Sequence, residues 1–135
     1  MPKINPVIHF EMPYKEADRM INFYSKIFGW EMNKLGSEMG NYIIAATAKS
    51  DIRNDGYKGS IDGGFFPLEP ASPSKHPSIV IGVENINEKI KQINETNGKI
   101  LGESMDIPGV GKYVLFEDTE GNKVGLLQPI MVNLS

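Results

Sequence analysis

The chain has 135 residues, of which 40% are hydrophobic and 23% charged, enough for one globular domain with a real core. The net charge of −3 and the absence of cysteine exclude a basic nucleic-acid surface, attraction to anionic lipid, disulfides and cysteine-ligated metals. The N-terminal segment lacks the apolar core of a signal peptide, and no apolar run is long enough to cross a membrane. We therefore expect a cytoplasmic protein with neither a nucleic-acid nor a membrane partner.

The first predicted elements lie in residues 7–35 and read as strand, helix, turn and strand. Val7 to Phe10 is rich in β-formers, and Pro13 is expected to end that strand because proline cannot donate to a ladder. Apolar residues then recur at helical offsets and predict one buried stripe: Met20, Ile21, Tyr24, Ile27 and Phe28. Gly29 is expected to stop the helix, and Trp30 to begin the second strand.

The rest of the first half predicts two strands and a linker. Residues 42–48 form the third strand, residues 49–58 an exposed loop and residues 59–67 the fourth strand. The pair Gly63 and Gly64 indicates either a close approach by a ligand or backbone, or a bulge. The proline-rich residues 68–77 form the linker.

The second half repeats this order of elements. A strand at 78–83 precedes a helix, for which Asn85 is the expected cap with Glu88 in the capping-box position. Three further strands are expected, at residues 99–105, 113–117 and 123–129. The predicted fold is therefore α+β: two βαβββ modules, about 5–67 and 78–129, in one domain with curved mixed sheets around a cavity. The tail, residues 130–135, is expected on the surface or on a partner subunit.

Three stretches carry a resemblance to a known family: FYSKIFGW at 23–30, FEDTEGNKVGLLQP at 116–129 and IPGVGKY at 107–113. Together with the repeated order, they resemble the vicinal-oxygen-chelate superfamily, which includes glyoxalase I, extradiol dioxygenases and bleomycin-resistance proteins. The chain is most similar to small bacterial proteins described as glyoxalase-like. The resemblance implies one domain over residues 1–135, a homodimer and a small organic ligand.

Metal-dependent members of that superfamily place ligands on the first, fourth, fifth and eighth strands. The resemblance puts these positions on His9, Gly63, Ser78 and Gly125. Asp62 lies beside Gly63 with the opposite strand parity, and His76 precedes Pro77 outside the strand. Because only His9 carries a suitable ligand, binding without a metal or other cofactor is favoured. The alternative is a divalent metal held by His9, Glu11 and a displaced His76.

His9 and Glu11 project from the same strand face, because side chains alternate. They could act as general acid and base, or form a structural hydrogen-bonded pair. Other candidates for lining a ligand cavity are Trp30, Tyr42, Gly63, Phe65, Ser78, Tyr113 and Gln128. Core packing is the alternative for the aromatic residues and is favoured for Phe66 and Phe116, whereas the rim of the pocket is favoured for Trp30 and Phe65.

Three functional hypotheses follow. The first is a metal-independent protein that binds a small organic molecule in a cavity between the sheets. The second is a lyase or isomerase resembling lactoylglutathione lyase, or a dioxygenase-like enzyme, that uses His9 and Glu11. The third is a dimeric interaction module without a cavity. The sequence has no nucleophile elbow, phosphate-binding loop or dinucleotide-binding glycine pattern, so it does not decide whether the protein is an enzyme.

Overall fold

A computed structural model describes residues 3–47 and 59–130. The predicted loop at 49–58 and residues 131–135 of the tail lie outside the described residues. The chain divides into two compact units, His9–Pro77 on one side and Met1–Ile8 with Ser78–Ser135 on the other. Within the described ranges, each half runs strand, helix and three strands, which confirms the predicted α+β fold of two βαβββ modules.

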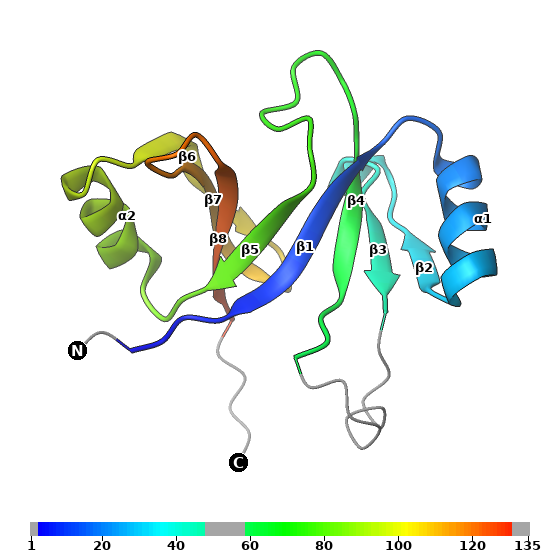
Figure 1. The fold of residues 1–135 in the computed structure, drawn as a ribbon, viewed down its shortest axis with the longest axis horizontal. Helices are drawn as coiled ribbons and strands as arrows, with labels where there is room; N and C mark the ends of the chain where they lie inside the picture. The colour runs from blue at the N-terminus through cyan, green and yellow to red at the C-terminus, as the bar shows by residue number, and fades with distance from the viewer. Residues whose placement is uncertain (1–2, 48–58, 131–135) are drawn as a thin grey trace. The chain divides into compact units, whose positions relative to one another are not determined.

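In its described residues, the first module holds four strands in the order β2-β3-β4-β1 (Figure 1). Its elements are β1 (Val7–Tyr14), α1 (Ala17–Phe28), β2 (Glu31–Lys34), a short 3-10 helix (Ser37–Met39), β3 (Ile43–Ala46) and β4 (Gly63–Pro67). β1 and β4 run parallel, whereas β3 pairs antiparallel with both β2 and β4. The first two residues of β1 belong to the other compact unit.

The core of this module lies between its sheet and α1. Ile43, Ala45 and Phe65 are buried there, and Met20 and Tyr24 of α1 pack against them. The C-terminal end of the predicted buried stripe is exposed to solvent, since Ile27 and Phe28 are 57% and 58% exposed. Gly29 adopts the left-handed conformation that ends α1 as predicted.

The prediction that Pro13 ends the first strand is wrong, because β1 continues to Tyr14 and Pro13 pairs with Phe66 of β4. The register explains why proline is tolerated. Phe10 N donates toward Asp62 O, and Tyr14 O accepts from Leu68 N, so the even-numbered residues direct their polar groups to β4. Pro13 is odd-numbered and directs its nitrogen away from β4, so its missing N–H removes no bond from this pair.

The second module has the strand order β5-β8-β7-β6. Its elements are β5 (Ser78–Gly82), α2 (Ile86–Glu95), β6 (Lys99–Ile107), β7 (Gly111–Glu117) and β8 (Lys123–Pro129). Val83, Ile86, Val114 and Leu126 form its buried core. Neither helix within the described residues is long and apolar enough to span a membrane.

Asn85 caps α2 as predicted, since its side chain accepts from Glu88 N at 3.1 Å. The adjacent amide, Ile86 N, donates to Gln128 Oε1 of β8 at 2.9 Å. Two side chains therefore satisfy the first amides of α2.

Candidate functional site

Strand register divides the polar and apolar side chains of the first module between the two faces of its sheet. Phe10, Met12 and Tyr14 of β1 pack into the core beside α1. His9 and Glu11 alternate with them and project from the opposite face. Glu11 pairs with Gly64 of β4, which in turn pairs with Ile44 of β3. These three positions therefore share the face turned away from α1.

A continuous hydrogen-bonded chain of three side chains lies on this outer face. The Tyr42 hydroxyl donates to Glu11 Oε2 at 2.9 Å, and the same hydroxyl lies 2.9 Å from His9 Nε2. The His9 and Tyr42 rings are nearly parallel, with an angle of 18° between their planes. All three residues are partly buried. Tyr42 thus joins the two residues that the sequence selected as an acid–base pair.

Gly64 makes room for the Tyr42 ring. A Cβ placed on Gly64 would lie 2.1 Å from the Tyr42 hydroxyl oxygen, too close for any side chain. On the other face, a Cβ on Gly63 would lie 2.4 Å from the Phe10 ring. The paired glycines therefore serve a close approach, as one of the two sequence interpretations held, but the groups that approach them are side chains of the same module.

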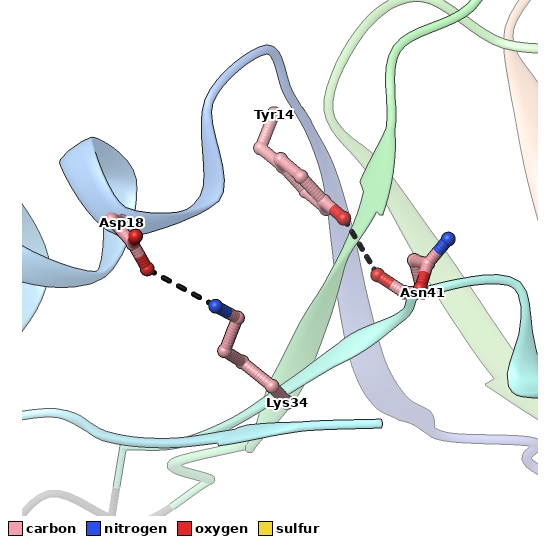
Figure 2. A network of polar contacts seen from close by, with 4 residues as sticks. All are labelled: Tyr14, Asp18, Lys34 and Asn41. Carbon is pink, nitrogen blue, oxygen red and sulfur yellow. Dashed lines mark hydrogen bonds and ion pairs between the residues drawn. The ribbon is translucent and has the colours of Figure 1, made fainter. Parts of the chain in front are cut away.

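The backbone around Tyr42 is held from several sides. Leu35 N donates to Tyr42 O at 2.9 Å, which extends the pairing of β2 and β3 by one step. The Tyr14 hydroxyl donates to the carbonyl oxygen of Asn41 at 2.7 Å, and Asn41 is left-handed, with φ of 56° (Figure 2). The Tyr14 bond fixes the residue that precedes Tyr42 against β1, and the Leu35 bond holds Tyr42 itself at the end of β2.

Figure 2 also shows an ion pair between β2 and α1. Lys34 Nζ lies 3.1 Å from Asp18 Oδ1, and both side chains are well exposed to solvent. An exposed ion pair of this kind contributes little to stability. The apolar core and the Tyr14 bond therefore do more than this ion pair to hold the elements around Tyr42.

Burial dominates the electrostatics of His9. It lowers the pKa of the imidazole from its ordinary value of 6.5, because a charged ring loses hydration, while the negative charges of Glu11 and Asp62 act in the opposite direction. A neutral imidazole can donate one hydrogen bond and accept another. The site therefore offers an uncharged acceptor or base beside a carboxylate.

Several other candidates lie elsewhere in the first module. Phe65 is 2% exposed in the core, and Trp30 stacks on Tyr24 with 4.7 Å between ring centroids. Both therefore contribute to the core of the first module, whereas the sequence favoured the rim of a pocket for them. Phe66 follows Gly64 at the alternate position of β4 and shares the outer face with His9, although core packing was favoured for it.

The candidates in the second module have contacts of their own. Gln128 caps the start of α2 through its side-chain oxygen. Tyr113 of β7 packs on Gly125, where an added Cβ would lie 2.8 Å from the ring. Ser78 begins β5 and is partly buried, while Phe116 packs against the core.

The positions expected to hold a metal do not form a ligand set. His9 directs Nε2 to the Tyr42 hydroxyl, so a phenol is the hydrogen-bond partner of this nitrogen. Among residues 3–47 and 59–130, no three His, Asp or Glu side chains gather closely enough to hold an ion. Asp62 accepts from Thr47 N at 2.8 Å, and His76 is exposed.

Gly63 and Gly125, at two of the positions expected to hold a metal, also do not fit a ligand set. Gly63 and Gly125 have no side chain, and the space beside each is filled by an aromatic ring, Phe10 and Tyr113 respectively. A carboxylate at either position would need that ring to move. The residues present therefore do not fit the imidazole and carboxylate ligands of a metal centre.

Sequence reasoning missed the bridging role of Tyr42. Tyr42 precedes β3 and lies 31 residues from Glu11 in the chain, so no local spacing connects the two. The glycine pair was the available signal, because it indicated that something approaches β4 closely.

The fold and this polar cluster define an α+β protein of paired βαβββ modules with a hydrogen-bonded imidazole, phenol and carboxylate on one sheet face. The model of the Glyoxalase/Bleomycin resistance protein/Dioxygenase superfamily matches residues 7–126. The chain therefore belongs to this superfamily.

Other comparisons show what the chain is similar to. A glyoxylase-like domain-containing protein from Didymella fabae is 28% identical over 115 residues, which cover 83% of this chain and 84% of that protein. A hypothetical protein from Bacillus halodurans has a similar structure, with a TM-score of 0.70, 16% identity and coverage of 98% and 100%. Methylmalonyl-CoA epimerase from Mycobacterium tuberculosis has a TM-score of 0.68, 13% identity and coverage of 97% and 94%. At these identities the structural likeness concerns the fold.

Proposed function

We propose that this protein binds a small organic molecule on the outer face of its first module, without a tightly bound metal. The observation that carries the proposal is the chain from His9 Nε2 through the Tyr42 hydroxyl to Glu11 Oε2, with both links at 2.9 Å. It supplies a few fixed polar groups on a sheet face that also carries Ile44, which is 38% exposed. Convergent polar groups beside apolar surface are typical of small-molecule sites.

A fluorinated phenol tests this proposal, because it combines a hydrogen-bond donor with an apolar ring. Binding of 4-fluorophenol to chelator-treated protein would be followed by fluorine NMR, with 4-fluoroanisole, which has no donor, as the matched ligand. We expect 4-fluorophenol to bind about tenfold more tightly than the anisole, the effect of one hydrogen bond. Equal affinity for both ligands, or binding that requires added metal, would contradict the proposal.

Variants of the two histidines test which of them causes the preference for 4-fluorophenol. His9→Phe keeps a ring but removes both nitrogen atoms, and it should abolish the preference for the phenol. His76→Phe makes the same change at the other histidine, which is exposed in the linker, and should leave the preference unchanged. Amide spectra of both variants check that the fold is intact.

The second candidate function is acid–base catalysis at the same cluster. It is favoured by the lowered pKa of His9, because a neutral imidazole can accept a proton at neutral pH. The similar fold of methylmalonyl-CoA epimerase makes methylmalonyl-CoA a reasonable first probe. Protein-dependent incorporation of deuterium at its C2 position in heavy water would support a proton-abstracting enzyme, provided that Glu11→Gln abolishes this incorporation. No enzyme-dependent incorporation would favour the binding protein.

We also propose a homodimer, as the family resemblance implies, and a cytoplasmic location, which the absence of cysteine supports. Analytical ultracentrifugation tests the assembly state of the full chain. A single species at the mass of one chain over the accessible concentration range would exclude the dimer.

A further inference from the structure

We infer that the Tyr42 to Glu11 link holds His9 as its Nε2–H tautomer, so that the Nδ1 lone pair receives a hydrogen-bond donor of the ligand. The ligand class is then a neutral molecule with a hydroxyl or amide N–H group attached to an apolar body. This inference deepens the proposed function and rests on it for the role of the ligand.

The direction of the hydrogen bonds follows from the number of hydrogens available. An ionised carboxylate only accepts, so the single hydrogen of the Tyr42 hydroxyl goes to Glu11 Oε2. The hydroxyl oxygen can then only accept from His9, 2.9 Å away, and Nε2 must carry the hydrogen. In a neutral imidazole the other nitrogen, Nδ1, is therefore an acceptor.

Nδ1 is also accessible. No hydrogen bond joins it to another residue in the described part of the chain, where His9 is bonded through Nε2. In the same described part, no fully buried side-chain nitrogen or oxygen lacks a hydrogen-bond partner. Nδ1 must consequently keep some solvent-exposed surface, and the inference requires that the donor of a ligand reaches it there.

The surrounding charges select the kind of ligand. Among the described residues, Glu11 and Asp62 are the acidic groups whose charges act on His9, and these charges disfavour an anion beside it. A neutral donor meets no such repulsion. Ile44 of β3 and Phe66 of β4 lie on the same sheet face and can contact an apolar body.

Nitrogen NMR of protein labelled in the histidine rings tests the tautomer. Since the chain has two histidines, His76→Ala identifies the His9 signals. At about pH 7.5 we expect a protonated-type shift for Nε2 and an unprotonated-type shift for Nδ1. The opposite pattern, or an even mixture of tautomers in the unaltered protein, would overturn the inference.

Two variants test the cause of this preference. Tyr42→Phe removes the acceptor of Nε2–H and should give a mixture of tautomers. Glu11→Gln allows an amide to donate to Tyr42 and reverse the chain, so the Nδ1–H form should increase. If one variant fails to fold, the other still tests the link. An unchanged tautomer in the folded variants would show that Tyr42 and Glu11 do not set it.

Addition of 4-fluorophenol tests the contact with the ligand. The Nδ1 resonance of His9 should move on binding, and 4-fluoroanisole should leave it in place. Binding of the phenol without movement of Nδ1 would overturn this inference and leave the proposed function standing. Failure of the phenol to bind would overturn the proposed function and the ligand role of Nδ1, whereas the tautomer is measured without any ligand.

Discussion

Tyr42 and Gly64 constrain each other. The phenol can reach both His9 and Glu11 only because position 64 has no side chain, since a Cβ there would lie 2.1 Å from the hydroxyl oxygen. The glycine therefore acts as a steric requirement of the polar chain rather than as a ligand-binding residue.

Gly64→Ala should accordingly destabilise the protein by about 1 to 3 kcal/mol, the usual effect of overpacking. In a Tyr42→Ala background the ring is absent, and the same substitution should cost much less. Urea unfolding of the four proteins in this double-mutant cycle measures the difference. An equal cost in both backgrounds would mean that Tyr42 is not what excludes a side chain at position 64.

His9 should make stability depend on pH. Burial lowers its folded pKa below the unfolded value of 6.5, so the unfolded chain binds its proton first as pH falls. The stability gained by keeping His9 neutral is complete above the unfolded pKa and is lost as the pH falls through the lower folded pKa. Unfolding free energies at about pH 7.5 and about pH 5 should therefore differ more in the unaltered protein than in His9→Asn. His76→Asn is the control and should keep the full difference.

At the level of single residues, the sequence predicts part of the site. Strand alternation was enough to place His9 and Glu11 on one face, because that rule is local. The bond to Tyr42 depends on the pairing of β3 with β4 and of β4 with β1, which no local pattern contains. The same holds for Gln128, whose side chain turns out to cap a helix 42 residues away.

The two helices differ in how their N-terminal amides are capped. The first amides of α2 are bonded by Asn85 and Gln128, whereas Glu16 makes no side-chain cap at the start of α1. The capping pattern was readable in the sequence because the cap and its amide are three residues apart. The effect of Pro13 on the first strand was not readable in the sequence, because it depends on which side of β1 carries β4.

Asn85→Ala should destabilise the protein by about 1 kcal/mol, the typical value for a lost cap. Gln128→Met keeps the volume but leaves the amide of fully buried Ile86 without its acceptor, which should cost about 1 to 3 kcal/mol. Glu16→Ala is the matched control at the other helix and should change stability by less than about 0.5 kcal/mol. Equal losses at the two helix starts in urea unfolding would contradict this assignment of caps.

For the molecule as a whole, element order predicted more than any single motif. Two successive runs of strand, helix and three strands point to two βαβββ modules even though their sequences differ, because hydrophobic period and turn residues persist when side chains change. The chemistry does not follow in the same way, since a family's fold can carry many sites. Glycines at positions 63 and 125 show how far this chain departs from a metal-binding arrangement.

The place where a small molecule binds is measured most directly by amide NMR with 4-fluorophenol. We predict that the largest shifts occur at His9, Glu11 and Gly64, on the sheet face away from α1. The competing surface is the exposed apolar end of α1, where Phe23 and Phe28 are 51% and 58% exposed. Shifts confined to α1, with His9 and its neighbours unmoved, would contradict the account.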